Sequence, residues 1–281
     1  MFEPVRKAAR KVWRRHGVSE GLRAVPEETA LAITYNGGTY AVMMGTPQDY
    51  RDFAYGFSLS EGVVADIGEI ESFEAVEFDD GVELRMWLSS DKAESISARR
   101  RQIAGPTGCG LCGIDSITEA VKPAAVVGAG GSFTFGQIMT AVDALAPLQK
   151  INIETRAVHA AAFWTPDHGI VALREDVGRH NALDKLAGSL AQARIDTGQG
   201  MVLLTSRVSV EMVQKTAAIG APLMVSVSAP TALAIRLAEA AGITLAAIAR
   251  SDGFEVFTHP HRVTAGVSGQ DNGHPRAHFV A

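Results

Sequence analysis

Hydrophobic and polar residues alternate over short distances in the first hundred residues of the chain. Two pairs of apolar-rich stretches predict β-hairpins, residues 31–35 with 39–44 and residues 73–78 with 82–88. Asn36-Gly37-Gly38 separates the first pair and supplies the positive φ angles of a tight hairpin turn. Residues 50–61, between the hairpins, predict a helix. Residues 27–104 are therefore predicted to form a small β-rich unit with one main helix.

After about residue 132 the pattern changes to apolar strands that alternate with amphipathic helices. Strands are predicted at 158–164, 169–174, 201–205, 223–227 and 243–249, and helices at 137–148, 178–196, 211–219 and 229–241. Pro230 is placed near the first turn of the last helix, and Gly242 ends that helix. This alternation predicts an α/β core over residues 132–260, with a parallel or mixed sheet covered by helices on both faces.

The ends of the chain and the segment between the two units carry weaker patterns. Residues 1–26 are interpreted as a basic arm, because residues 5–16 hold six Lys and Arg, and we expect this arm to be solvated or partly disordered. Residues 105–131 are rich in glycine and predict a loop and linker. Residues 261–281 show little pattern and are interpreted as a tail.

Composition narrows the class of protein. Of the 281 residues, 47% are apolar and 20% are charged, which is ordinary for a globular protein with a full core. The net charge of −5 argues against a general nucleic-acid binder. There is no apolar run of about 18 residues, and the first residues lack the apolar stretch of a secretory signal. We therefore expect no membrane association and a cytoplasmic location.

The cysteines are the most informative part of the composition. The chain has two, Cys109 and Cys112, in a C-x-x-C pattern within the glycine-rich loop. The thiolate is the nucleophilic form of cysteine, and Arg99, Arg100 and Arg101 could stabilise a thiolate on Cys109. The flanking glycines remove side-chain bulk, so the loop could visit a sulfur donor and a sulfur acceptor in turn. The pattern favours a persulfide carrier in which Cys112 resolves or relays the sulfur.

Other chemistry remains open for the two thiols. A zinc site would need further ligands such as His159, His168 or His180, and no spacing points to them. A thioredoxin-like exchanger places C-x-x-C between a strand and a helix, and two inert buried thiols are a third alternative. A zinc deaminase is disfavoured, because Ala182 stands where the Glu of its H-x-E signature belongs. We expect no bound metal.

Three segments carry distinctive strings of residues. They are Thr107-Gly-Cys-Gly-Leu-Cys-Gly113, Arg174-Glu-Asp-Val-Gly-Arg-His-Asn-Ala-Leu-Asp-Lys185 and Val227-Ser-Ala-Pro-Thr231. The second string is long and unusual, and residues 40–44 and 56–62 fit the same pattern. Over residues 27–260 the chain resembles the FdhD family, the formate dehydrogenase accessory sulfurtransferases.

The resemblance implies a sulfur carrier. The family takes sulfur from a cysteine desulfurase and passes it to the molybdenum cofactor in its bis(molybdopterin guanine dinucleotide) form, before this cofactor enters formate dehydrogenase. Cys109 is then the expected persulfide carrier and Cys112 an accessory thiol. The family fold resembles the cytidine deaminase architecture without its zinc site, and relatives imply a homodimer. A non-catalytic cofactor-binding chaperone and a C-x-x-C thiol–disulfide oxidoreductase remain the alternatives.

The resemblance also implies a cofactor-binding segment at the end of the last core strand. This segment maps to Ile248, Ala249, Arg250, Ser251, Asp252 and Gly253. The residue types agree, because open α/β sheets bind ligands at the carboxyl ends of their strands. Arg250 is a fixed cation for phosphate, and Asp252 could accept hydrogen bonds from a guanine edge. The alternative is that Arg250 and Asp252 form a solvated turn.

Further candidates lie where strands lead into helices. Arg179 and His180 stand at the start of the predicted 178–196 helix, whose free N–H groups favour a phosphate. Alternatively, Asp176 caps this helix and His180 is a core residue. The turns at 205–209 and 228–231 supply hydroxyl groups that either cap helices or join a shared dinucleotide pocket.

Overall fold

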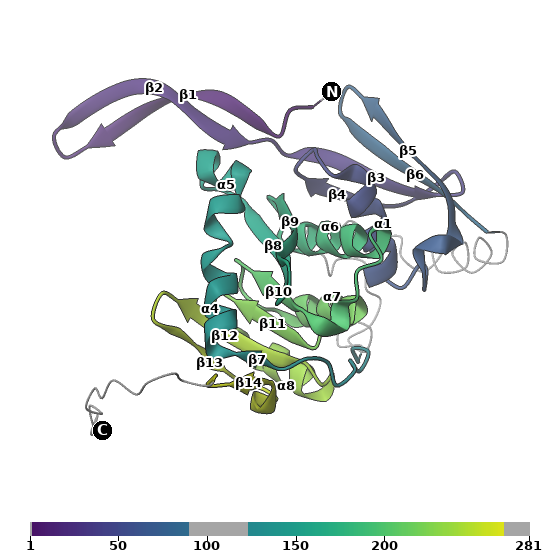
Figure 1. The fold of residues 1–281 in the computed structure, drawn as a ribbon. Helices are drawn as coiled ribbons and strands as arrows, with labels where there is room; N and C mark the ends of the chain where they lie inside the picture. Colours follow the sequence, from purple (N-terminus) through teal and green to yellow (C-terminus); the bar gives the residue numbers. More distant parts are fainter. Residues whose placement is uncertain (1, 90–122, 267–281) are drawn as a thin grey trace.

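The computed structural model describes residues 2–89 and 123–266 (Figure 1). Cys109, Cys112 and the three arginines at 99–101 lie outside the described residues, so the roles expected for them stay predictions. The described chain forms an N-terminal hairpin, a four-stranded sheet and a six-stranded sheet, with a further short two-stranded pairing.

The basic N-terminal stretch forms a long β-hairpin. Strands β1 (Val5–Arg14) and β2 (Gly17–Pro26) pair antiparallel, and the hairpin extends away from the rest of the molecule (Figure 1). Its side chains are mostly exposed, which agrees with the solvated arm among the two alternatives predicted, and the arm is folded as two paired strands. Opposite the basic residues of β1, strand β2 places small, apolar or acidic residues, such as Gly21 across from Arg10 and Glu20 across from Lys11. This register avoids the like-charge contacts that would oppose pairing.

The N-terminal unit is a four-stranded sheet in the order β4-β3-β6-β5. Its strands are β3 (Thr29–Tyr35), β4 (Gly38–Gly45), β5 (Ile70–Phe78) and β6 (Gly81–Leu88). Both predicted hairpins are confirmed, and Asn36 and Gly37 have φ angles of 48° and 77° in the first turn. Parallel strands β3 and β6 are connected through helix α1 (Tyr50–Ser60) and the 3₁₀ turn η1 (Ile67–Glu69). Helix α1 confirms the helix predicted at 50–61.

One face of this sheet packs on α1. Alternate side chains of β3 and β6 are buried against Phe53 and Phe57 of the helix, as the period-two pattern requires. The buried strand residues are Leu31, Ile33, Tyr35, Val82, Leu84, Met86 and Leu88.

The core sheet has six strands in the order β13-β12-β11-β10-β8-β9. They are β8 (His159–Thr165), β9 (Gly169–Asp176), β10 (Met201–Leu204), β11 (Leu223–Ser226), β12 (Thr244–Arg250) and β13 (Gly253–Val256). Strands β10, β11 and β12 run parallel, whereas β8 pairs antiparallel with β9 and β10, and β13 antiparallel with β12. The sheet is therefore mixed, and only β13 was absent from the predicted strands.

Helices cover both faces of the core sheet. Helices α6 (Arg179–Gln192), α7 (Val210–Ile219) and α8 (Ala232–Ala240) bury apolar side chains against one face. Helix α4 (Phe135–Asp143) packs against the other face through Ile138 and Ala141. The predicted α/β class, a mixed sheet with helices on both faces beside a smaller β-rich unit, is confirmed.

Three predicted helices differ at their ends. The helix predicted at 178–196 ends earlier, at Gln192. The helix predicted at 137–148 stops at Asp143 and continues as the 3₁₀ turn η2 (Ala146–Leu148) and helix α5 (Lys150–Thr155), because Pro147 lacks the N–H that a helix interior needs. Pro230 lies outside α8, whose first turn is capped by Thr231 through a hydrogen bond from Ala234 N (3.2 Å).

The predicted tail begins inside the core. Residues 260–262 form the 3₁₀ turn η4 (Pro260–Arg262), and β14 (Val263–Thr264) pairs parallel with β7 (Phe133–Thr134). The buried side chain of Arg262 donates hydrogen bonds to the carbonyl oxygens of Ala129 (2.6 Å) and Gly242 (2.8 Å). These contacts anchor residues 260–264 through partners distant in sequence, which a local pattern does not reveal.

The two sheet units meet where α1 crosses α6 (Figure 1). A Cβ atom on Gly56 of α1 would lie 1.7 Å from the carbonyl oxygen of Asp184. A Cβ atom on Gly188 of α6 would lie 2.0 Å from the carbonyl oxygen of Asp52. The helix backbones therefore touch, and only glycine fits at either position. None of the helices in the described ranges is long and apolar enough to cross a membrane.

Gly188→Ala is expected to lower the free energy of unfolding by about 1–3 kcal/mol, because the new methyl group meets backbone atoms that cannot move aside locally. Denaturant titration of both proteins measures the loss. Gly136→Ala in α4 is the matched control, since its Cβ would meet nothing closer than the Thr134 hydroxyl at 3.9 Å. Equal stability of the Gly188→Ala variant and the wild type would contradict the close crossing.

Candidate functional site

The carboxyl ends of the parallel strands form one edge of the core sheet, which we call the carboxyl edge. Strands β10, β11 and β12 end there at Leu204, Ser226 and Arg250. Because β8 is antiparallel to β10, its first residue His159 lies at the same edge. Strand β9 also ends at this edge and leads into α6. The edge thus gathers segments that are far apart in sequence.

Hydroxyl groups tie the turns of the carboxyl edge to one another. Ser226 Oγ donates to the carbonyl oxygen of Ser206 (2.7 Å) and accepts from Ser228 N (3.0 Å). Thr205 Oγ1 accepts from Ala160 N (2.8 Å). Thr231 caps α8, as one of the two readings predicted. The described hydroxyls of these turns therefore organise the backbone of the edge.

The predicted cofactor-binding segment 248–253 forms the turn from β12 to β13 at this edge. Ile248 has a φ angle of 55°, a left-handed conformation that is strained for a β-branched residue and costs about 1–3 kcal/mol. The strand register shifts between Ala247 and Arg250, and Ile248 N donates to the carbonyl oxygen of Ser228 (3.1 Å). Strained backbone of this kind concentrates at functional sites.

Arg250 and Asp252 project from this turn into solvent. Arg250 Nη1 donates to the carbonyl oxygens of Val227 and Ala249, the second at 2.9 Å. These bonds anchor one side of the guanidinium group, and Nη2 has no partner among the described residues. Ser251 and Asp252 are exposed. The segment is therefore a solvated turn, as the alternative interpretation predicted. Whether it also binds the cofactor stays a prediction.

Positive charge gathers at the carboxyl edge. Arg179 begins α6 directly after β9, and Arg207 follows the end of β10, so both residues belong to segments of this edge. The pKa of His159 is lowered first by burial and then by the charges of Arg179 and Arg207, against an opposing effect of Asp176. Together with Arg250, Arg179 and Arg207 give the edge three arginines, whose planar guanidinium groups suit phosphate oxygens.

His180 lies behind this edge, in the first turn of α6. Its Nε2 is buried without a hydrogen-bond partner and stands 3.8 Å from Glu211 Oε2. Burial, and next the charge of Arg179, lowers the pKa of His180 to about 4. The ring is therefore neutral near pH 7.

Asp176 does not cap α6, which corrects one alternative from the sequence. The N-cap is Gly178, without a side-chain cap. The carboxylate of Asp176 instead accepts hydrogen bonds from the backbone of Thr46 (3.0 Å) and Gly178 (2.7 Å), and pairs with Lys185 Nζ (2.7 Å). Asp176 and Lys185 are both fully buried. The pair joins the end of β4 to α6.

A second buried ion pair joins α1, α6 and α7. Lys215 Nζ bonds both carboxylate oxygens of Asp184 (2.9 and 3.0 Å), Ser60 Oγ (2.9 Å) and Glu61 (3.1 Å). Burial lowers the pKa of Lys215, but Asp184 and Glu61 together raise it above the usual value. The ammonium group is therefore charged where α1, α6 and α7 meet.

Other residues of the 174–185 string also hold the fold together. Arg174 Nε pairs with Asp52 of α1 (2.6 Å). The Glu175 carboxylate accepts from the backbone N–H groups of Ile151 (2.9 Å) and Asn152 (2.8 Å) at the start of α5. Sequence reasoning did not assign these roles. One signal in the sequence could have indicated buried charges: Asp184 and Lys185 stand between the apolar residues Leu183 and Leu186.

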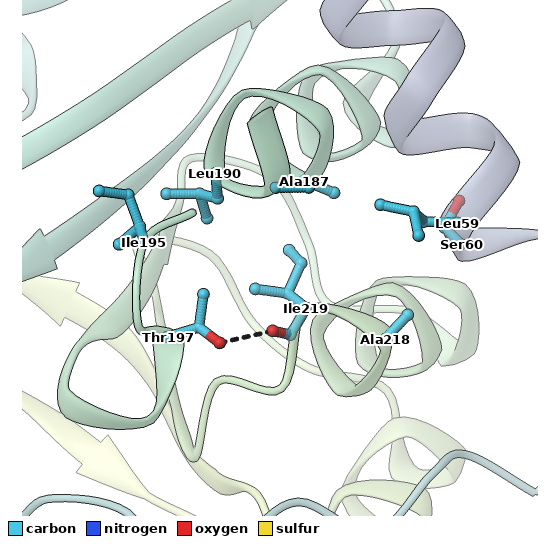
Figure 2. A pocket seen from close by; sticks show the side chains of 9 residues that line it. Leu59, Ser60, Ala187, Leu190, Ile195, Thr197, Ala218 and Ile219 are labelled. Carbon is cyan, nitrogen blue, oxygen red and sulfur yellow. Dashed lines mark hydrogen bonds between the residues drawn. The ribbon is translucent and has the colours of Figure 1, made fainter. Parts of the chain in front are cut away.

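One hollow lined by described residues lies away from the carboxyl edge. Figure 2 shows it between α1, α6 and α7, lined mainly by Leu59, Ala187, Leu190 and Ile219. It faces the loop before β10, at the amino ends of the strands, and contains none of the predicted site residues. Within the described ranges, no group of three or more His, Cys, Asp and Glu side chains could hold a metal ion.

Comparison with known proteins gives consistent matches over almost the whole chain. The model of the FdhD/NarQ family matches residues 26–264. A sulfur carrier protein FdhD of Agrobacterium fabrum is 50% identical over 259 residues, which cover 92% of this chain and 96% of that protein. A sulfur carrier protein FdhD of Cupriavidus necator is 46% identical over 251 residues, 89% of this chain and 87% of that protein.

A solved structure supports the fold. The crystal structure of a putative formate dehydrogenase accessory protein from Desulfotalea psychrophila matches with a TM-score of 0.74 and 26% sequence identity. The match covers 93% of this chain and 100% of that chain.

The buried ring of His180 makes stability depend on pH. An unfolded histidine titrates near about 6.5, whereas the pKa of folded His180 is about 4. Between these values the unfolded chain binds a proton that the folded chain does not, so stability falls as pH decreases. His180→Asn is expected to flatten this fall, as measured by urea unfolding at several pH values.

His168→Asn, on the exposed turn between β8 and β9, is the control and is expected to keep the wild-type pH dependence. Histidine titration followed by NMR tests the same point directly. A pKa of about 6.5 for His180, the value of a free side chain, would show that the ring is not buried as described.

Proposed function

The chain belongs to the FdhD/NarQ family, and on that premise we propose that it is a sulfur carrier serving formate dehydrogenase or a related molybdoenzyme. The observation that carries the proposal is the 50% identity, over 92% of this chain, to a relative named sulfur carrier protein FdhD. The solved relative described as a putative formate dehydrogenase accessory protein supports the choice of client.

Cys109 is the proposed sulfur acceptor. Its thiolate attacks the terminal sulfur of a persulfide on a cysteine desulfurase. A bond forms between Cys109 Sγ and that sulfur while the sulfur–sulfur bond of the donor breaks, and the donor cysteine leaves as a thiolate. The product is a persulfide on Cys109, and the step involves no net oxidation or reduction.

Cys112 is the proposed accessory thiol. Release of the carried sulfur as sulfide requires two electrons. Cys112 provides them when its thiolate attacks Cys109 Sγ, so that hydrosulfide leaves and a Cys109–Cys112 disulfide forms. A cellular thiol reductant then restores both cysteines. The acceptor substrate is the molybdenum cofactor in its bis(molybdopterin guanine dinucleotide) form, which takes the sulfide as a ligand.

The carboxyl edge is the proposed binding place for the guanine nucleotide part of this substrate. Arg250 offers free N–H groups to phosphate oxygens, and Arg207 is exposed in the neighbouring turn. Asp252 accepts hydrogen bonds from the guanine edge. The other residues of the segment, which supply the backbone of the turn, are Ile248, Ala249, Ser251 and Gly253.

The setting of this transfer is also part of the proposal. The proposed chemistry uses two reduced thiols, which suit a reducing compartment, and we therefore propose a cytoplasmic location. We propose that the chain acts as a homodimer.

A cofactor-binding chaperone without catalysis is the second candidate. The observation that favours it is the carboxyl edge itself, because its three arginines could hold an anionic cofactor without any thiol. The chaperone and the sulfur carrier differ in whether Cys109 becomes covalently modified, and a thiol–disulfide oxidoreductase would cycle both cysteines without gaining sulfur.

Incubation with a cysteine desulfurase and cysteine is expected to add the mass of one or more sulfur atoms to the protein, because Cys109 takes up the sulfane sulfur. Intact-mass spectrometry under non-reducing conditions measures this gain. Cys109→Ala should abolish it, while Cys112→Ala should retain it on Cys109. Full activation of formate dehydrogenase by Cys109→Ala would refute the carrier mechanism and leave the chaperone.

Arg250→Ala is expected to weaken the binding of GDP by about tenfold or more, the effect of losing a charge-assisted hydrogen bond to phosphate. Isothermal titration calorimetry measures the affinity. Arg236→Ala, an exposed arginine on α8, is the control and should bind GDP as the wild type does. Unchanged affinity of the Arg250→Ala variant would remove this residue from the site.

A further inference from the structure

The β1–β2 hairpin has few contacts with the rest of the chain. It extends from the base of the four-stranded sheet as a separate two-stranded ribbon (Figure 1). Trp13 and Leu22 are 77% and 63% exposed. A two-stranded ribbon alone is only marginally stable in water, so a partner that pairs with it would add substantially to its order.

The hairpin carries a concentrated positive charge. Residues 2–26 contain seven Lys and Arg against two Glu. Lys11 and Arg6 pair with Glu20 and Glu27. Arg10 and Arg14 of β1 are exposed and form no ion pair with any described residue.

Strand β5 and the turns beside it carry the opposite charge. Residues 66–83 contain eight Asp and Glu and no Lys or Arg. Glu71, Asp79 and Asp80 are exposed and make no ion pair within the described part of the chain. The acidic segment lies on the far side of the four-stranded sheet from the hairpin tip (Figure 1).

Both strands also have a free backbone edge. Strand β5 is the last strand of its sheet, and β1 pairs only with β2 within residues 2–89 and 123–266. The other side of the hairpin is occupied in part, since Arg23 of β2 donates to the carbonyl oxygen of Thr155 in α5 (3.0 Å). The outer edges of β1 and β5 therefore present N–H and C=O groups that another strand can pair with.

The charges on β1 and β5 determine which of their outer edges can pair with each other. Two β1 strands repel each other, and so do two β5 strands, because like charges oppose strand pairing. A β1 strand and a β5 strand attract. Since the hairpin points away from β5 of its own chain, the complementary surface is available on a second copy.

We propose that β1 of one protomer adds to the edge of β5 in a second protomer, and that β5 of the first receives β1 of the second. The two contacts are equivalent and close a two-fold dimer. Each four-stranded sheet would thereby be extended by a hairpin from the partner. This inference rests on the proposed homodimer and names its surface, and it is independent of the sulfur chemistry.

Two charge-reversal variants test the proposal, Arg10→Glu/Arg14→Glu on β1 and Glu71→Arg/Asp80→Arg on β5. Each is expected to be monomeric, with a dimer dissociation constant raised by about tenfold or more. Sedimentation velocity at low salt measures the oligomeric state, and the wild-type dimer is expected to weaken as salt increases. Arg194→Glu/Arg236→Glu, which reverses two exposed charges elsewhere, should remain dimeric.

Mixing the two monomeric variants gives the decisive result. In the mixed pair one contact joins a native β1 to a native β5, and the other brings the two new glutamates of β1 to the two new arginines of β5, so a dimer should re-form. Failure to re-form overturns the proposed surface, as does a wild-type dimer that both variants retain. A wild-type protein that is monomeric at low salt overturns the homodimer itself, while the mass assay for sulfur uptake still reports on the proposed carrier function.

Discussion

The fully buried ion pair between Asp176 and Lys185 is the constraint on which the rest of the structure depends. Two charges removed from water are tolerated only when other groups complete their hydrogen bonds, and here the backbone at Thr46 and Gly178 does so. Those groups come from both sheet units. The pair therefore stabilises one relative position of β4 and α6. Loss of either partner would leave an uncompensated charge in the interior.

The string at residues 174–185, which carries the family resemblance, mainly connects the two sheet units to each other. Asp176, Asp184 and Lys185 connect the units, and Arg174 and Glu175 bond to α1 and α5. The string also crosses the carboxyl edge, where β9 ends at Asp176 and Arg179 and His180 begin α6. A motif that identifies a family can thus be maintained by the packing of two units, while the groups suited to bind an anionic substrate come from shorter and less distinctive turns.

Local chemistry explains which parts of the fold could be predicted. The Asn36-Gly37 turn and the amphipathic helices α1, α6 and α7 follow from residues close in sequence. The β1–β2 hairpin was missed because charge repulsion within one strand was considered without the partner strand that relieves it. The end of the core at Arg262 and the buried roles of Asp176 and Lys185 depend on carbonyl groups and charges from distant segments. The segment at 248–253 was placed correctly at a strand end, but the left-handed backbone of Ile248 has no signature in the sequence.

The conformation of Ile248 has an entropic consequence. An isoleucine adopts a left-handed backbone only where the surrounding hydrogen bonds leave it no alternative, as the bond from Ile248 to Ser228 and the anchoring of Arg250 do here. The turn is therefore held in one conformation by contacts within the folded chain. The nucleotide proposed to dock on it would not need to order the loop, so less of its interaction energy would be consumed in binding. The energetic cost of the strain falls on folding, and the surface proposed for binding is already preorganised.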